Sequence, residues 1–350
     1  MALIRKEQLE KKSNRRMSVR DVAQRAGVSI ATVSRSINSP EMVRPALRLK
    51  IEEAIAELGY VPDGNARALV SRQTMTIGAI VPTIDNAIFS TLIRGLQIKL
   101  QENKYTLLLA SSNYSLEQEA EEVRTLLIRG VDGILLVGNQ RSAEVYDLLD
   151  NSAKPYVNTY AFDERLDHPC VGFDNWKAGE TIVEHLVELG HERIAVIAGI
   201  TTDNDRALAR VQGMKTGMSR NGLVFNAEQY LECPYTLEAG RAALRTLMQR
   251  QPRPTAIICG NDILACGAIF QCQRDNISVP GDLSIAGVDG LSIGGHVTPS
   301  LTTMSVPFYE MGELAATSLL DRLNSNDNAP RKVELEATLL IRESTAIPRL

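Results

Sequence analysis

The side chains with the clearest chemistry lie in one short stretch near the N-terminus, residues 29–38. Arg35 can donate two hydrogen bonds to O6 and N7 of a guanine, while Ile30 and Ala31 can contact thymine methyl groups. The stretch also holds short polar groups that suit DNA phosphates, which fix register rather than sequence. The candidate DNA-binding residues of this stretch are Ser29, Ile30, Ala31, Thr32, Ser34, Arg35 and Asn38.

A second group of such residues is spread over the rest of the chain, where carboxylates, amides, arginines and aromatic rings follow short apolar runs. This combination is typical of sites for hydroxylated small molecules. Arg206 and Arg210 stand at i and i+4 of an expected helix, so together they can receive a carboxylate. The candidate residues for binding a small-molecule effector are Asp85, Phe89, Asp174, Arg206, Arg210, Tyr235, Asn261 and Asp289.

Several of these polar residues also have a purely structural interpretation. Asp262, next to Asn261, can cap the helix that begins there, and Asp174 can cap a helix that starts near Trp176. We favour the capping role for Asp262. Arg210 can simply pair with Asp289, because an unpaired buried guanidinium is costly.

The elements that must position the first group are three short helices. Ser18 is expected to cap a first helix, Gly27 to supply a turn with positive φ, and Ser29 to cap a second helix that runs to Ile37. A third amphipathic helix is predicted over 45–58, with Pro45 at its first position. This is the layout of a helix-turn-helix DNA-binding domain; the alternative is a helical hairpin of some other domain.

The elements that must position the second group alternate between apolar β-branched runs and longer amphipathic runs. This alternation predicts parallel, doubly wound α/β sheets, whose ligands bind at the carboxyl ends of the strands. We expect strands, buried on both faces, over 76–81, 106–110, 133–137, 156–159, 194–198, 256–259 and 283–288. We expect helices over 89–103, 116–129, 176–188, 206–221, 237–250 and 262–274.

The charge distribution separates the two parts of the chain. The net charge is −4, but residues 1–76 carry 14 Lys and Arg against 8 Asp and Glu, whereas residues 77–350 carry 24 against 34. A basic N-terminal part on an acidic body is typical of a DNA-binding module joined to a domain with another task. The five cysteines form no CxxC pair, which favours reduced thiols in a cytoplasmic protein without a metal site.

The sequence lacks the motifs that other classes of protein require. Gly290–Gly294 spells GxSxG, but the only histidine that follows Ser292 is His296, four residues on, so the hydrolase triad cannot be assembled in its usual order. Neither GxxxxGK[ST] nor GxGxxG occurs, and we therefore expect no nucleotide cofactor and no enzyme activity. The N-terminal residues have no apolar core of a signal peptide, and no run is long enough for a membrane helix, which disfavours a stand-alone solute-binding protein.

The runs DVAxxAGVSxxTVSRxxN and LGYxPxxxARxL, together with the body that follows, resemble the LacI/GalR family of bacterial repressors over about residues 18–345. The resemblance implies a hinge helix in which Leu69 wedges into the minor groove beside Arg67, in agreement with the chemistry of minor-groove wedges. It also implies a body like a periplasmic sugar-binding protein. The expected domains are an extension over 1–17, a helix-turn-helix domain over 18–62, a hinge over 63–74 and an effector domain over 75–345, with lobe 1 over 75–173 and 306–334 and lobe 2 over 174–304 and 335–345.

Within the family, the sequence looks most like the repressors of gluconate utilisation, particularly over 171–175, 271–274 and 285–287. The resemblance places Phe89, Arg210, Tyr235, Asn261 and Asp289 at the usual effector contacts. Asp289 departs from the histidine expected there, and an aspartate suits sugar hydroxyls better than an acid. From the resemblance and the pair Arg206 and Arg210 we expect a sugar acid such as gluconate as effector, while the aspartate leaves a neutral sugar or nucleoside open.

The family resemblance also implies partners. We expect a cytoplasmic repressor that binds double-stranded, pseudo-palindromic operator DNA as a homodimer or a dimer of dimers, with no membrane partner. The basic extension over 1–17 can add phosphate contacts or serve as a solubilising tail, and we favour the tail.

Overall fold

The computed structural model describes residues 17–62, 73–324 and 331–349. The chain divides into two compact units, a head over residues 1–74 and a body over residues 75–350. Arg67, Leu69 and the extension over 1–16 lie outside the described residues. No helix in the described ranges is long and apolar enough to cross a membrane.

The head is a three-helix unit whose boundaries follow its capping residues. Ser18 donates hydrogen bonds from its backbone N and its Oγ to Asp21, and Ser29 Oγ accepts from Thr32 N at 3.1 Å. Gly27 has a φ of 68°, as the predicted turn requires. The described helices are α2 (Val19–Ala26), α3 (Ile30–Asn38), the short 3-10 helix η1 (Pro40–Met42) and α4 (Pro45–Leu58).

One small apolar core holds these helices together. Val22 on α2, Val33 on α3 and Ile51 on α4 are fully buried, and Ile37, Leu47, Ile55 and Leu58 pack around them. The predicted layout of three helices in the head is therefore confirmed. Because Val33, Ser36 and Ile37 turn inward, the opposite face of α3, with Ile30, Ala31 and Arg35, is left on the surface.

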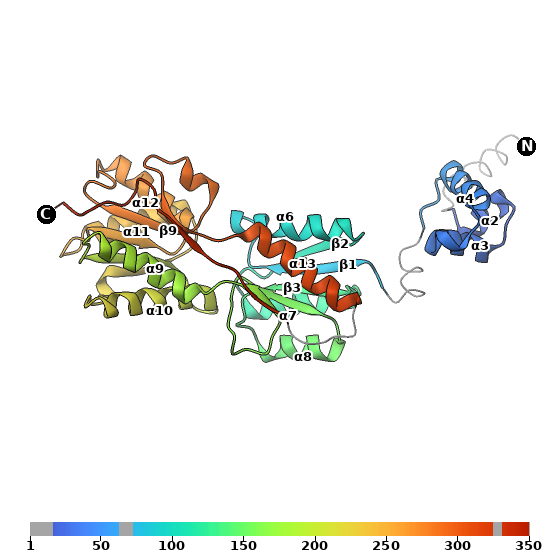
Figure 1. Ribbon diagram of the computed structural model, residues 1–350, viewed down its shortest axis with the longest axis horizontal. Coiled ribbons are helices and arrows are strands. Elements are labelled where there is room, and N and C mark those ends of the chain that lie inside the picture. Colours follow the sequence, from blue (N-terminus) through green and yellow to red (C-terminus); the bar gives the residue numbers. More distant parts are fainter. Residues whose placement is uncertain (1–16, 63–72, 325–330, 350) are drawn as a thin grey trace, which may run out of the picture. The chain divides into compact units, whose positions relative to one another are not determined.

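The body consists of two lobes, each built on a six-stranded sheet (Figure 1). The first sheet has the strand order β11-β5-β4-β3-β1-β2, with all neighbours parallel. Its strands are β1 (Thr76–Val81), β2 (Thr106–Ser111), β3 (Gly133–Val137), β4 (Tyr156–Thr159), β5 (Cys170–Gly172) and β11 (Lys332–Glu334). Its helices are α6 (Ala87–Glu102), α7 (Leu116–Ile128), α8 (Ala143–Ser152) and α13 (Phe308–Asn324).

The second sheet has the order β12-β10-β9-β8-β6-β7, in which only the pair β10–β12 is antiparallel. Its strands are β6 (Ile194–Gly199), β7 (Tyr230–Cys233), β8 (Ala256–Cys259), β9 (Ser284–Asp289), β10 (Thr302–Ser305) and β12 (Thr338–Leu340). Its helices are α9 (Asn175–Glu188), α10 (Asp205–Arg220), α11 (Leu237–Met248) and α12 (Asp262–Arg274), with 3-10 helices η2 (Ala227–Gln229) and η3 (Ser292–Gly295).

Within the described residues, the chain crosses from one sheet to the other three times, after β5, after β10 and after β11. The predicted doubly wound α/β class is confirmed. Small residues let the helices pack closely: a Cβ at Gly95 of α6 would lie 2.1 Å from the carbonyl oxygen of Tyr309 on α13. Figure 1 shows α6 and α13 side by side on lobe 1.

One strand prediction was wrong. β2 is not buried on both faces, because it is the edge strand of its sheet, and Leu109 is 46% exposed. Helices α8 and α13 and the short strands β5, β7, β10 and β11 were not predicted, whereas β12 lies in the C-terminal segment 335–345 that the family resemblance assigned to lobe 2. The five cysteines carry no disulfide, and four of them are buried.

Candidate nucleic-acid interface and ligand cleft

The outer face of α3 carries the candidate DNA-binding side chains of the described head. Ile30 is 42% exposed, Ala31 and Arg35 are also exposed, and Val33 and Ser36 on the opposite face are buried. Arg35 forms no ion pair with any described residue. Its guanidinium is therefore not engaged by a carboxylate of the described head.

The short polar residues at the start and along the outer face of α3 form hydrogen bonds with one another. Ser29 Oγ lies 2.8 Å from Thr32 Oγ1, and Asn38 Nδ2 donates to Ser34 Oγ at 3.4 Å. These local bonds orient hydroxyl and amide groups along an exposed helix face. The predicted face thus exists as a surface, and Arg67 and Leu69 cannot be placed beside it because they lie outside the described residues.

In the body, the carboxyl ends of the strands from both lobes meet at one buried cavity. Phe89 follows β1, Tyr160 follows β4 and Phe173 follows β5, all in lobe 1, while Asn261 follows β8 and Asp289 ends β9 in lobe 2. The predicted position of a ligand site in such sheets is met. The cavity, here called the deep chamber, is lined by Asn86, Ile88, Phe89, Tyr114, Tyr160, Phe173, Asn204, Arg206, Arg210, Tyr235, Asn261 and Asp289.

Four buried polar atoms in the wall of the deep chamber have no hydrogen-bond partner among the described residues. They are Tyr160 Oη, Arg210 Nε, Asn261 Nδ2 and Asp289 Oδ2. Buried polar groups are nearly always paired, and each unpaired one costs about 1–3 kcal/mol. Four of them around one small cavity make it the candidate ligand site of the body.

Backbone strain concentrates at the same place. Tyr114, Tyr160 and Asp289 have φ values of 61°, 69° and 120°, a region that residues with side chains rarely adopt. Asn113 and Asp203, close by, have φ values of 49° and 55°. Strained non-glycine residues cluster at ligand clamps and switch regions, so this observation supports the same site independently of the unpaired atoms.

The favoured structural interpretation assigned the cap of the helix to Asp262, but the residue that caps it is the neighbouring Asn261. Asn261 is the cap of α12, since its Oδ1 accepts from Leu264 N at 2.9 Å, and its free Nδ2 lies in the chamber wall. Asp262 is the first residue of the helix and accepts from Leu291 N at 2.7 Å and from Thr303 Oγ1 at 2.6 Å. The capping role predicted for Asp262 was therefore wrong. Burial raises the pKa of Asp262 to about 7.

Arg210 and Asp289 do not form the ion pair that the sequence allowed. Arg210 donates from Nη1 to Asn175 Oδ1, and Asn175 Nδ2 in turn donates to the carbonyl oxygen of Tyr160 at 2.8 Å. Burial raises the pKa of Asp289 well above its usual range; nearby Asp262 raises it further, and Arg210 lowers it. Asp289 is therefore held toward its neutral form.

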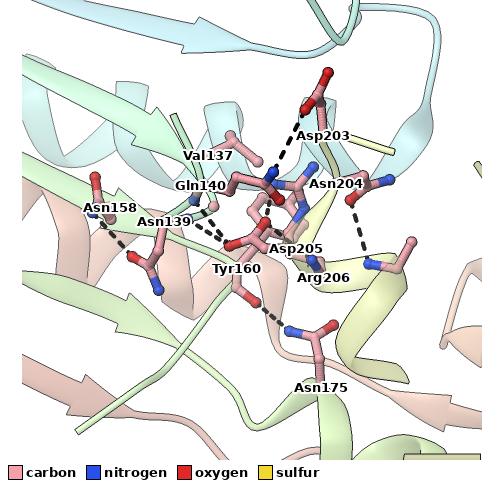
Figure 2. Close-up of polar contacts among 12 residues, drawn as sticks. Val137, Asn139, Gln140, Asn158, Tyr160, Asn175, Asp203, Asn204, Asp205 and Arg206 are labelled. Carbon is pink, nitrogen blue, oxygen red and sulfur yellow. Dashed lines mark hydrogen bonds and ion pairs between the residues drawn. The ribbon is translucent and has the colours of Figure 1, made fainter. Parts of the chain in front are cut away.

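Arg206 lies at the contact between the two lobes, which Figure 2 shows in detail. Its neighbour Asp205 in α10 of lobe 2 accepts hydrogen bonds from the backbone N of Asn139 at 2.7 Å and of Gln140 at 3.3 Å, both in lobe 1. Asp205 Oδ1 also accepts from Arg206 Nη1 at 3.2 Å. A Cβ at Gly138 would lie 2.1 Å from that Nη1, so Arg206 is packed against the lobe 1 loop.

A wider cleft, here called the outer chamber, adjoins the deep chamber. It encloses about 620 Å³ and shares Asn86, Tyr114, Asn204 and Tyr235 with the deep chamber. The rings of Tyr114 and Tyr235 face each other from the two lobes, with centroids 6.2 Å apart. The remaining lining residues are Thr83, Asp85, Asn113, Ile200, Thr202, Asp203, Pro234, Thr236 and Ile263.

The predicted effector residues divide among these places. Phe89, Arg206, Arg210, Tyr235, Asn261 and Asp289 line the deep chamber, and Asp85 lines only the outer one. Asp174 lines neither: it caps α9 by accepting from Lys177 N at 2.9 Å, as its structural interpretation predicted, and it faces a separate cleft beside Trp176. The candidate effector residues did not include six others that line the deep chamber, namely Asn86, Ile88, Tyr114, Tyr160, Phe173 and Asn204.

Known families cover the head and much of the body. A family model described as bacterial regulatory proteins, lacI family, matches residues 18–63, and one described as periplasmic binding protein-like domain matches residues 183–345. The HTH-type transcriptional repressor CytR of Escherichia coli K12 is 33% identical over 339 residues, which cover 97% of this chain and 99% of the relative. The chain belongs to the LacI family.

Two further members of the LacI family are informative. The HTH-type transcriptional regulator GntR of Escherichia coli K12 is 31% identical over 325 residues, 93% of this chain and 97% of that protein. A solved structure described as a transcriptional regulator CelR–cellobiose complex matches with a TM-score of 0.70 and 29% identity, over 94% of this chain and 100% of that one.

The family resemblance predicted from the helix-turn-helix and hinge motifs is thus confirmed. This LacI-family chain is a DNA-binding transcriptional repressor with a periplasmic-binding-protein-like body. Family members of this kind bind operator DNA and a small-molecule effector. The relatives named above are regulators of transcription, not enzymes.

Proposed function

We propose that this LacI-family repressor is switched by a sugar acid, such as gluconate, bound between the lobes with its carboxylate in the deep chamber. The observation that carries the proposal is the set of four unpaired buried atoms on Tyr160, Arg210, Asn261 and Asp289. Arginine Nε and asparagine Nδ2 only donate hydrogen bonds, and a tyrosine hydroxyl can donate. A carboxylate only accepts, with about four lone-pair positions, so it complements such a set.

The aspartate at position 289 is compatible with an acid once its protonation is considered. An ionised Asp289 would repel a carboxylate, but burial raises its pKa well above the usual range. In the neutral form its carboxyl group can donate a hydrogen bond to the effector. Arg210, which is not neutralised by an ion pair, supplies the positive charge for the anion.

A neutral sugar or a nucleoside is the second candidate. The aromatic residues Tyr114, Tyr235 and Phe89 offer flat faces for a ring, and the related CelR structure holds cellobiose. In that case Asp289 would act as an ionised acceptor for ligand hydroxyls. The two candidates therefore differ in the protonation state of one residue.

We further propose that the repressor binds a pseudo-palindromic operator as a homodimer. Two heads related by a two-fold axis read two half-sites, so the symmetry of the protein is mirrored in the DNA. α3 would supply the base contacts through Arg35, and the expected hinge residue Leu69 would enter the minor groove. Such a partner also implies a cytoplasmic location.

The effector can change operator affinity only if it binds two arrangements of the body differently. A ligand between the lobes meets this requirement, because groups of both lobes line the chamber and Asp205 joins lobe 2 to the loop of Asn139 and Gln140. Ligand contacts then favour one spacing of the lobes over another. The spacing in turn alters the geometry presented to the hinge and heads.

The first experiment is a thermal-shift screen of the full-length protein with sugar acids, neutral sugars and nucleosides. A ligand at 100 times its Kd should add about 2.7 kcal/mol of stability. Stabilisation by gluconate or another sugar acid, but not by the matching neutral sugar, supports the proposal. Stabilisation by neutral sugars alone overturns the acid assignment, and operator titration with the stabilising ligand tells inducer from corepressor.

A further inference from the structure

The deep and outer chambers differ sharply in size. The deep chamber has about 20 Å³ of free volume, enough for one small polar group and too little for a sugar ring. The outer chamber has about 620 Å³, within the range of sites that hold drug-sized ligands. A sugar acid that places its carboxylate in the deep chamber must therefore have the rest of its atoms in the outer one.

The two chambers also differ in charge. Arg206 and Arg210 line the deep chamber, whereas the outer chamber is lined by the carboxylates Asp85 and Asp203 and by no lysine or arginine. The charge thus changes sign along the cleft. An anionic group is favoured only at the inner end, and a phosphate or second acid group is disfavoured at the outer end.

The wall of the outer chamber has the composition of a sugar-ring site. Tyr114 and Tyr235 supply aromatic faces from the two lobes, with the ring planes inclined at 34°. Asp85 and Asp203 are exposed acceptors for hydroxyl groups. Strained backbone at Asn113 and Tyr114 and again at Asp203 holds both sides of this chamber in rarely adopted conformations.

We infer that the effector is a glycosylated sugar acid, with the carboxylate of its open-chain acid unit in the deep chamber and a neutral sugar ring in the outer chamber. This inference rests on the proposed function, since the acid end is the one assigned there. It adds that a single-unit acid such as gluconate fills the cleft only in part. The sugar ring contributes hydroxyl contacts to the carboxylates and apolar contacts to the tyrosines.

The test uses matched ligands that share one acid unit. Gluconate is compared by calorimetry with its 4-O-glycosyl derivatives maltobionate, cellobionate and lactobionate, and with the neutral disaccharides maltose, cellobiose and lactose, on the full-length protein. We expect at least one of these glycosylated acids to bind tenfold or more tighter than gluconate. Its neutral counterpart should bind at least tenfold more weakly than that acid.

Two variants probe the outer chamber alone. Thr202 is exposed and lines only this chamber, so Thr202→Trp should remove the affinity advantage of the glycosylated acid over gluconate. Leu208→Trp, also exposed but not in the lining, is the matched control and should keep that advantage. Asp85→Ala, a smaller change in an exposed loop, should lower the affinity for the glycosylated acid more than the affinity for gluconate.

The outcomes separate this inference from the proposed function. If gluconate binds and all its glycosylated forms bind equally or more weakly, the inference of a sugar ring in the outer chamber is overturned and the acid effector stands. If none of the acids binds while a neutral disaccharide does, the proposed acid effector itself is overturned. An advantage of the glycosylated acid over gluconate that survives Thr202→Trp and Asp85→Ala would also contradict the outer chamber as the location of the ring.

Discussion

Arg210 and Asn175 are joined by a hydrogen bond from the guanidinium Nη1 to the amide Oδ1, and this bond takes the place of an ion pair between Arg210 and Asp289. Asn175 begins α9 at one of the three crossings between the lobes and also holds the carbonyl oxygen of Tyr160. Arg210 is thus oriented by a neutral partner. It keeps its full charge and an unpaired Nε in the wall of the deep chamber.

Arg210→Ala should therefore abolish the response to the effector without loss of operator binding. Removal of a charged hydrogen-bond donor costs about 1.5–3 kcal/mol, which corresponds to roughly 10- to 150-fold weaker binding. Calorimetry gives the effector affinity, and DNA titration with and without ligand gives the response. Arg245→Ala, an exposed arginine of α11, is the matched control. Unchanged effector affinity in Arg210→Ala would remove this residue from the site.

The pH dependence of effector binding should report Asp289. Because burial raises its pKa, the neutral form predominates at low pH and can donate to a carboxylate ligand. As the pH rises through this raised pKa, binding must take up a proton, and the affinity for an acid falls by up to about tenfold per pH unit. Asp289→Asn, which stays neutral, should keep the affinity and flatten the profile.

The neutral-sugar alternative gives the opposite result for the same variant. An ionised Asp289 that accepts ligand hydroxyls would bind more strongly at high pH, and Asp289→Asn would weaken binding throughout. Calorimetry of both proteins between pH 6 and 9 separates the two cases. A flat profile in the unmodified protein would count against an effector contact by Asp289.

Much of the head could be predicted because its signals are local. Ser18, Ser29 and Pro45 mark helix starts within a few residues, and the apolar spacing selects the inner faces that Val33 and Ile51 now occupy. The alternation in the body likewise indicated parallel sheets. The family resemblance placed residues 306–334 in lobe 1, but no helix was predicted there, because α13 precedes only the short edge strand β11 and the other strands of its sheet lie more than a hundred residues earlier.

The site was only partly predictable, for a related reason. Tyr114 and Tyr160 act through positive φ values imposed by the surrounding loops, and no neighbouring glycine or proline announces such a conformation. The prediction of Asp262 as a helix cap was wrong because the sequence cannot show which of two adjacent polar residues caps the helix and which bonds to the interior of the lobe. The bonds from Leu291 and Thr303, 29 and 41 residues further on, decide it.

Asp205 should stabilise the contact between the lobes. Asp205→Ala removes the acceptor for the backbone N of Asn139 and Gln140, and loss of these bonds should cost about 1–3 kcal/mol of unfolding free energy. A smaller fraction of the molecules would then have the two lobes in contact. Because only this fraction binds the effector, the apparent effector Kd should rise. Small-angle scattering and calorimetry measure the two effects. Glu238→Ala, in the first turn of α11, is the control, and an unchanged lobe spacing would contradict this role.

Leu69 lies outside the described residues, so its prediction rests on the hinge motif alone. Leu69→Ala should weaken operator binding because the minor-groove wedge is lost, while effector affinity stays unchanged. Fluorescence anisotropy with operator DNA and calorimetry with effector measure both. Leu49→Ala, a 56% exposed leucine of α4, is the matched control. Equal operator affinity in Leu69→Ala and the unmodified protein would refute the wedge.

Arg35 should determine one base position in each half-site. Its guanidinium is exposed on α3 without a carboxylate partner in the described head, so it is available to a guanine edge, a contact worth about 1–3 kcal/mol of discrimination. Arg35→Ala should flatten base preference at that position in a selection from randomised operators. Preferences at the other positions should remain.

The control for Arg35 is an arginine that is exposed on the neighbouring helix. Arg20 lies on α2, so Arg20→Ala should weaken binding to all operators about equally if this side chain contacts a phosphate, with the salt dependence reduced and the sequence profile intact. The comparison separates base reading from charge. A sequence profile of Arg35→Ala that matches the unmodified protein at every position would assign Arg35 to the DNA backbone instead.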